Sequence, residues 1–133
     1  MKVYLAARYS KNAEMREFAA YLLAGGYATE ITSRWISGSH EIGDHPTDEA
    51  RRRLAQEDLD DLKAADVVIA FSEVPRTMNN ARGGRHVEFG LAIALGKRII
   101  VVGPKENVFH YLPGISHVES GMKAAHLMAL VGA

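Results

Sequence analysis

Two short runs of aliphatic and β-branched residues most constrain what this chain can fold into. Asp66 to Phe71 reads Asp-Val-Val-Ile-Ala-Phe, and Arg98 to Val102 reads Arg-Ile-Ile-Val-Val. Strands that are continuously apolar, rather than alternating, are buried on both faces, as in a parallel sheet covered by helices. The chain must therefore place helices on both sides of a sheet.

Strand and helix patterns alternate along the rest of the sequence. We expect strands at Lys2–Ala7, Tyr27–Trp35, Asp66–Phe71, Arg98–Val102 and about Ser116–Val118, and helices at Asn12–Leu23, Thr47 or Asp48 to about Ala65, Val87–Leu95 and about Gly121–Leu130. This alternation predicts a doubly wound α/β fold, Rossmann-like or flavodoxin-like, with a mostly parallel five-stranded sheet and helices on both faces. Ligands bind such sheets at the carboxyl ends of the strands.

Composition limits the class of protein. The 133 residues suit one domain, 1–133, and 47% of them are hydrophobic, which is enough for a core. The 16 basic and 16 acidic residues give no net charge, which argues against a nucleic acid polymer as partner. The chain has no cysteine, no signal-peptide pattern and no apolar run long enough to span a membrane. We expect a soluble, cytoplasmic protein that does not bind membranes.

Glu88 is the first candidate functional residue. It lies in the stretch Gly83 to Gly90, whose Gly-Gly pair allows a tight turn and a close approach of the backbone to a ligand. In the helix predicted from Val87 to Leu95, Glu88 falls in the first turn, where the helix dipole favours the carboxylate anion. An ionised carboxylate in this place suits a covalent nucleophile. The alternative is a charge that only complements the dipole.

Asp58 is the second candidate. Its direction on the predicted helix lies among three apolar residues: Leu54, Leu62 and Ala65. We expect three neighbouring acids to point away from this apolar stripe: Glu57, Asp60 and Asp61. An acid among apolar side chains needs a polar partner or serves as a site, and such surroundings raise its pKa, which suits a proton donor. The alternative is an acid that pairs with a buried backbone or basic group.

Together, two carboxyl groups in contrasting environments form the pattern that cleaves a glycosidic bond. One would attack the anomeric carbon while the other handles the proton of the leaving group. Other motifs are missing: no Gly-x-Gly-x-x-Gly follows the first strand, no Gly-x-Ser-x-Gly elbow is present, and the six histidines lack metal-ligand spacing. We therefore expect neither a metal nor an organic cofactor.

Three segments of the sequence resemble the nucleoside 2-deoxyribosyltransferase superfamily. Val3 to Ala7 is similar to the first strand of that family with its tyrosine, Glu57 to Asp66 to its acidic helix, and Gly84 to Gly90, with Ala92 and Gly96-Lys97, to its nucleophile helix. The resemblance covers about Val3 to His117, and the site pattern is closest to the nucleoside 5′-monophosphate N-glycosidases, which include the 2′-deoxynucleoside 5′-monophosphate N-hydrolases and the cytidylate hydrolases.

The resemblance implies roles for residues at the site. Glu88 would attack C1′ and expel the base, Tyr4 would orient that carboxylate, and Asp58 would contact the base or assist its protonation. Transferases that use free nucleosides carry an acid six residues before the nucleophile, whereas this chain has Arg82 there. A basic residue in a glycine-flanked loop at a helix N-terminus suits a phosphate. Arg8 and Ser10 could complete that phosphate site, although Arg82 could also be an ordinary loop residue.

The remaining candidate contacts lie in loops. Gly84 belongs to the Gly-Gly turn, and Trp35 offers a surface for stacking a base or is simply a core residue. The resemblance implies a homodimer in which a neighbouring subunit completes the site from the loop after the fourth strand. Asn107 and His110 lie in that loop, either as substrate contacts or as plain loop residues.

These observations leave three functions open. The first is an N-glycosidase that hydrolyses a ribo- or deoxyribonucleoside 5′-monophosphate through a covalent glycosyl-Glu88 intermediate. The second is a deoxyribosyltransferase in which a second base resolves the same intermediate. The third is a module that binds a nucleotide through Arg8 and Arg82 without catalysis.

Overall fold

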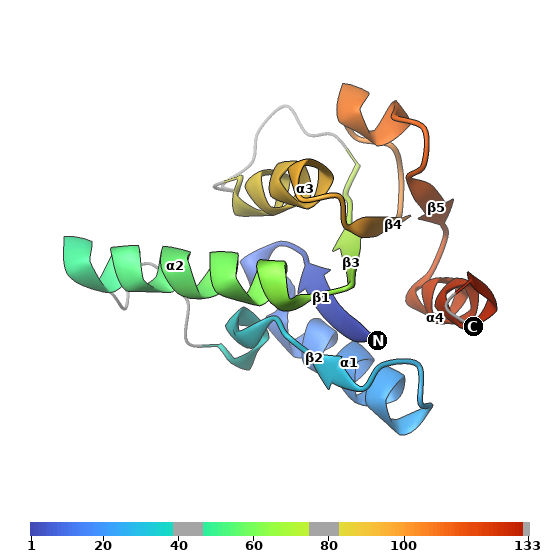
Figure 1. Cartoon of the computed structure of the whole chain (residues 1–133), viewed down its shortest axis with the longest axis horizontal. Helices are drawn as coiled ribbons and strands as arrows, with labels where there is room; N and C mark the ends of the chain where they lie inside the picture. The colour runs from blue at the N-terminus through green and yellow to red at the C-terminus, as the bar shows by residue number, and fades with distance from the viewer. Residues whose placement is uncertain (39–46, 75–82, 132–133) are drawn as a thin grey trace.

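The sheet confirms the predicted architecture. The structure, a computed structural model, describes residues 1–38, 47–74 and 83–131. Its strands are β1 (Lys2–Ala6), β2 (Glu30–Ile31), β3 (Val67–Phe71), β4 (Arg98–Val102) and β5 (Ser116–Val118). They pair in the order β2-β1-β3-β4-β5, and every pairing is parallel (Figure 1). Tyr4 lies opposite Val68, so the predicted catalytic tyrosine is central in the sheet.

Helices cover both faces of this sheet. They are α1 (Asn12–Ala24), α2 (Asp48–Ala64), α3 (Gly84–Ala94) and α4 (Gly121–Val131), with short 3-10 helices η1 (Tyr9–Lys11), η2 (Arg34–Ser37) and η4 (Val108–Tyr111). Helices α2 and α3 pack on one face, and α1 and α4 lie on the other (Figure 1). As expected, Thr47 caps α2, because its hydroxyl accepts a hydrogen bond from the Ala50 amide at 3.1 Å.

A single apolar cluster fills the space between the layers. Val3, Leu5 and Ile69 are fully buried, as the continuous apolar strands require. The adjacent β1 and β3 end side by side, so the residues that follow them lie at one edge of the sheet (Figure 1). No helix in the described part of the chain is both long enough and apolar enough to cross a membrane.

Two predicted elements have wrong boundaries. The second strand covers only Glu30–Ile31, because the chain turns into η2 at Arg34. Helix α3 begins at Gly84 rather than Val87, since Gly83 takes the left-handed conformation (φ 79°) that starts it. Glu88 is therefore one turn deeper in α3 than predicted. The helix dipole acts mainly within the first turn, so it is not the main influence on this carboxyl.

Candidate functional site

Three elements bring Tyr4, Asp58 and Glu88 together. Tyr4 comes from β1, Asp58 from α2 and Glu88 from α3, and both carboxyl groups act electrostatically on the Tyr4 hydroxyl. Tyr4 is fully buried. Its hydroxyl and Glu88 Oε2 are shielded from solvent, and within the described residues neither makes a hydrogen bond. The hydroxyl nevertheless lies near enough to favour ionisation of Glu88. Buried polar atoms in this state are poised to meet a ligand.

Burial is the main influence on the pKa values of Glu88 and Asp58. It raises the pKa of Glu88 to about 8, with repulsion from Asp58 adding to the effect and Tyr4 opposing it. Burial, followed by repulsion from Asp61 and Glu57, raises the pKa of Asp58 to about 7. The expectation that the helix dipole keeps Glu88 ionised is therefore wrong. Both carboxyls share a low-dielectric site, in which only one readily carries charge at neutral pH.

Asp61 differs from the sequence prediction. We expected it to point away from the apolar stripe, yet it is only 6% exposed and binds Arg34 of η2. The signal was present, because Asp61 follows Leu54 by seven residues, or two helical turns, and so lies on the same side of α2. Its pairing with a residue far away in the sequence was not predictable from this pattern.

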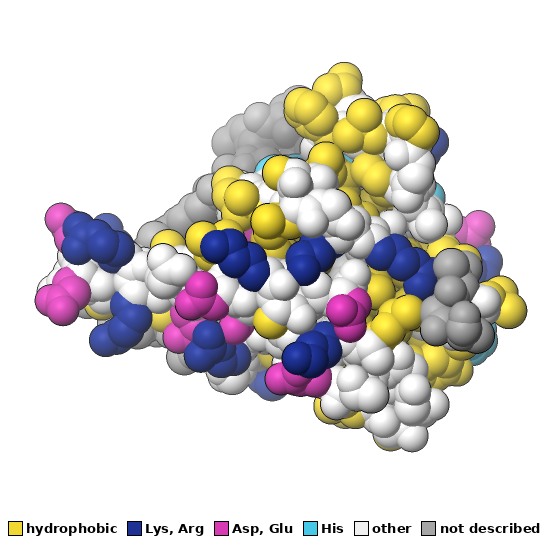
Figure 2. Space-filling model, in the orientation of Figure 1, with side chains coloured by type: hydrophobic (Ala, Val, Ile, Leu, Met, Phe, Trp, Pro, Cys, Tyr) yellow, Lys and Arg dark blue, Asp and Glu magenta, His cyan; other side chains and the backbone are white. Residues whose placement is uncertain are grey.

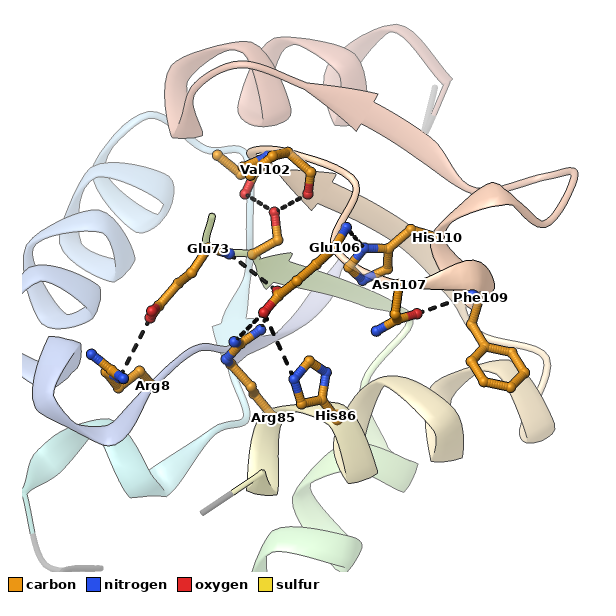
Figure 3. A network of polar contacts seen from close by, with 11 residues as sticks. Arg8, Glu73, Arg85, His86, Val102, Glu106, Asn107, Phe109 and His110 are labelled. Carbon is orange, nitrogen blue, oxygen red and sulfur yellow. Dashed lines mark hydrogen bonds and ion pairs between the residues drawn. The ribbon is translucent and has the colours of Figure 1, made fainter. Parts of the chain in front are cut away.

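A second polar network, absent from the sequence analysis, lies where β3 and β4 end (Figure 3). Glu106 accepts hydrogen bonds from Arg85 Nη1 at 2.5 Å, Arg85 Nη2 at 2.6 Å and the Glu73 amide at 3.1 Å, and its Oε2 lies 3.8 Å from His86 Nε2. The Glu106 amide donates to His110 Nδ1 at 2.7 Å. Burial opposes ionisation of Glu106, but the bonds from Arg85 and Glu73 outweigh it, and its pKa lies below the usual range.

This network joins the first turn of α3 to η4 and borders a small pocket. Eight residues line the pocket: Ala6, Ala70, Phe71, Ser72, Arg85, His86, Phe89 and His110. The pocket opens at the carboxyl ends of β1 and β3, the edge at which parallel sheets bind ligands. Arg85 and Glu88 are three residues apart on α3, and so share one face of this helix.

The predicted binding residues lie in several settings. Arg8 Nε lies 3.6 Å from Glu73 Oε2, at the edge of the network (Figure 3), while Ser10 is exposed in η1. Gly84 is the first residue of α3. Arg82 lies outside the described residues. So do residues 39–45 of the loop from Trp35 to His45, which by the family resemblance would cover the base.

Trp35, Asn107 and His110 all have structural contacts. Trp35 is only 4% exposed, and its Nε1 donates to the Leu5 carbonyl at 2.7 Å, which supports the alternative that it is a core residue. Asn107 caps η4 by accepting a hydrogen bond from the Phe109 amide at 3.0 Å (Figure 3). His110 is buried beside the pocket. The described residues contain no group of three or more acids or histidines placed to hold a metal ion.

Comparison with known proteins decides the family. A family model described as nucleoside 2-deoxyribosyltransferase matches residues 3–128. The chain belongs to this family. A search of curated proteins found no match.

Solved structures of two enzymes share the fold of this family member. A CMP N-glycosidase from Clostridium botulinum, BcmB, superposes with a TM-score of 0.60 at 21% identity, over 98% of this chain and 99% of that one. A 2-deoxyribosyltransferase from Bacillus psychrosaccharolyticus superposes with a TM-score of 0.68 at 20% identity, over 94% of this chain and 90% of that one.

Proposed function

We propose that this member of the nucleoside 2-deoxyribosyltransferase family is an N-glycosidase that hydrolyses a nucleoside 5′-monophosphate to free base and sugar 5-phosphate. The observation that carries the proposal is the convergence of Glu88, Asp58 and Tyr4 from three elements in one buried site. Two carboxyls with separate roles are the usual apparatus for glycosidic cleavage.

In this reaction the Glu88 carboxylate attacks C1′ and forms a glycosyl ester. The bond from C1′ to the base nitrogen breaks, and its electron pair leaves with the base, which takes a proton from Asp58. Water then attacks C1′ and gives a proton to the Asp58 carboxylate, the C1′–ester bond breaks with its electron pair going to Glu88, and the sugar 5-phosphate is released. Chemistry therefore requires Glu88 ionised and Asp58 protonated. The pKa values of about 8 for Glu88 and about 7 for Asp58 place the charge of the singly ionised pair mainly on Asp58. The reactive form, with Glu88 ionised, is the minor form of this pair and is reached when one proton moves from Glu88 to Asp58.

A phosphate on the substrate is supported by the basic residues around the pocket. Arg85, which Glu106 holds, and His86 border it on the first turn of α3, and a helix N-terminus attracts anions. Arg8, Ser10 and Arg82 are our further candidates for the phosphate site. A free nucleoside has no phosphate for these groups to bind, so we expect the monophosphate to be preferred.

Release of free base tests the proposal. Ribo- and deoxyribonucleoside monophosphates, and the matching free nucleosides, are incubated with the protein with and without a second free base, and products are separated by chromatography. Free base from a monophosphate alone establishes hydrolysis. Exchange only when a second base is present makes the protein a transferase, the reaction named in the family description. Nucleotide binding without any turnover leaves a non-catalytic module.

Replacing Tyr4 by phenylalanine separates catalysis from folding. The Tyr4 hydroxyl is buried without a hydrogen bond in the described structure, so its removal should not lower the melting temperature. A hydrogen bond to a charged group contributes about 1.5–3 kcal/mol, so we expect kcat to fall roughly 10- to 100-fold if Tyr4 orients Glu88. Calorimetry and steady-state kinetics measure the two effects. Unchanged kcat would remove Tyr4 from the mechanism.

A homodimer is part of the proposal. Hydrophobic side chains gather over η4 on the face shown in Figure 2, and three of them are largely exposed: Val108, Phe109 and Tyr111. A second copy that covers this surface would lie beside the pocket that His110 lines. Sedimentation should give twice the mass of one chain, and Phe109→Glu should yield monomers. A wild-type monomer at working concentrations would contradict the proposal.

A further inference from the structure

Arg34 of η2 is held firmly by one carboxylate of α2. Its backbone amide donates to Asp61 Oδ2 at 3.0 Å, its Nε donates to Asp61 Oδ1 at 2.9 Å, and its Nη2 lies 2.8 Å from the same Oδ1. The Asp61 side chain is 8% exposed, whereas the Arg34 side chain is 59% exposed. The Arg34 Nε also donates to Asp61 Oδ2, at 3.1 Å, so three of the four contacts involve the guanidinium. A buried acid with this set of contacts to one exposed arginine fixes where the guanidinium points.

Asp58 lies within the electrostatic reach of this guanidinium. Arg34 Nε is 3.6 Å from Glu57 Oε1, and Glu57 and Asp61 are one turn apart, so the arginine spans the turn that contains Asp58. The charged and titratable groups that act on or face Asp58 are, by element, Glu57 and Asp61 of α2, Arg34 of η2, Glu88 of α3 and Tyr4 of β1. Within the described residues Arg34 is the single cation in this set. Four other carboxyls act on it or on Asp58: Glu57, Asp60, Asp61 and Glu88.

We propose that Asp61 is a positioning residue that holds the Arg34 guanidinium away from Asp58, and thereby maintains the population of protonated Asp58 that can donate to a leaving base. The inference rests on the proposed function for its catalytic meaning. The electrostatic part of the inference does not depend on that function: Asp61 controls the charge of Asp58 through Arg34 whether or not the protein is a glycosidase.

The relevant competition is between two acids for one arginine. In the structure Arg34 lowers the pKa of Asp58 only as the last of four influences, behind burial, Asp61 and Glu57. Without the Asp61 charge, the long Arg34 side chain can turn to Asp58, and an opposite charge within hydrogen-bond reach lowers a carboxyl pKa by roughly 1–3 units. The singly ionised pair, whose charge already lies mainly on Asp58, would then carry it there almost entirely, and Glu88 would keep its proton. That distribution is unreactive, because the nucleophile is neutral and the acid has lost its proton.

Substitutions at Asp61 and Arg34 test this. Asp61→Asn keeps the shape and the acceptor for the Arg34 amide but removes the charge, and Asp61→Asn combined with Arg34→Gln also removes the cation. Asp60→Asn is the matched control. Asp60 is exposed on the same helix, its described hydrogen bond is with Gln56, and it acts on Arg34 only weakly and through space, without a described hydrogen bond to it. The carboxyl carbon of Asp58, assigned by its loss in Asp58→Asn, is followed by NMR against pH without substrate, and kcat is measured against pH in parallel.

We expect Asp61→Asn to lower the titration midpoint of Asp58 by roughly 1 unit or more and to lower kcat about tenfold at neutral pH. The double variant should recover most of both effects, and Asp60→Asn should change neither. A midpoint that stays the same in Asp61→Asn overturns the proposal. So does a midpoint that falls equally in the double variant, because loss of the Asp61 charge alone would then explain it.

Two further measurements, the Asp58 titration in Arg34→Gln and base release by the wild type, cover the cases in which Asp61→Asn does not fold or the protein is not a glycosidase. If Asp61→Asn fails to fold, Arg34→Gln alone should raise the Asp58 midpoint, and a midpoint that stays or falls overturns the proposal. If the wild type releases no base from any substrate, the proposed function fails. The NMR titrations still decide whether Asp61 acts through Arg34, so the two failures are distinguishable.

Discussion

Replacing Glu88 by glutamine is expected to reduce base release by at least roughly 10³-fold, because an amide cannot form the glycosyl ester. This corresponds to a loss of about 4 kcal/mol of transition-state stabilisation. The KM for the monophosphate should change little, since the groups assigned to the phosphate are Arg8, Arg82 and the first turn of α3. Single-turnover measurement with a monophosphate substrate checks the loss directly.

The control for this experiment is Glu17→Gln. Glu17 is exposed on α1, on the opposite face of the sheet, and its substitution removes the same charge without touching the site. Wild-type rates in Glu17→Gln and residual rates in Glu88→Gln would tie catalysis to the Glu88 carboxylate. A Glu88→Gln enzyme that retains a tenth or more of the wild-type kcat would show that Glu88 is not the nucleophile. Mass spectrometry of the quenched wild type should find the sugar phosphate on Glu88.

The sheet was predictable because its signals are local. The central strands are unbroken apolar runs, so Arg98–Val102 matches the structure residue for residue. The short strand expected about Ser116–Val118 also matches, although it is an edge strand without an apolar run. Helix α1 was placed within one residue by the spacing of its apolar side chains and the glycines after it. The second strand was overextended, because Thr32 and Ser33 look like strand residues although they lie between β2 and η2. Propensity alone does not reveal where the chain turns away from the sheet.

The candidate site was predicted in part, for a similar reason. Periodicity placed Asp58 on the inner side of α2, and the glycine-rich stretch pointed to Glu88. Their charge states depend on depth and on neighbours from other elements, which a linear pattern does not contain. The Asp61–Arg34 contact joins positions 27 residues apart, and the Arg85–Glu106 contact joins positions 21 residues apart. Such contacts depend on the tertiary structure, so the sequence pattern alone does not identify them.

Stability should fall as the pH rises from about 5 to about 8.5, in contrast to proteins whose carboxylates are paired. The pKa of Glu88 rises from 4.5 to about 8 on folding, and that of Asp58 from 3.8 to about 7. Between these limits the folded protein holds protons that the unfolded chain has released, so the free energy of unfolding decreases with pH. This stabilising contribution is complete below about pH 4, and it is lost as the pH passes the folded-state values.

The size of the effect follows mainly from Glu88. One unit of pKa shift corresponds to about 1.4 kcal/mol, but coupling with Asp58 and partial access of solvent reduce the total, so we expect about 2 kcal/mol between pH 5.5 and pH 8.5. For a chain of this length that is a decrease in melting temperature of roughly 5–10 °C. Calorimetry at constant ionic strength across this range measures it.

Glu88→Gln supplies the decisive comparison, because it removes the titrating group and keeps the shape. The variant should melt at the same temperature as the wild type or slightly below it at pH 5.5, and above it at pH 8.5, where the wild type carries a buried charge beside Asp58. A substitution that destroys catalysis would then stabilise the fold, as expected when a site holds a carboxylate in surroundings that disfavour it. If both proteins lose stability in parallel as the pH rises, the pH dependence comes from other groups. Ionisation of Glu88 would then not be disfavoured in the folded protein, contrary to what the burial of its Oε2 indicates.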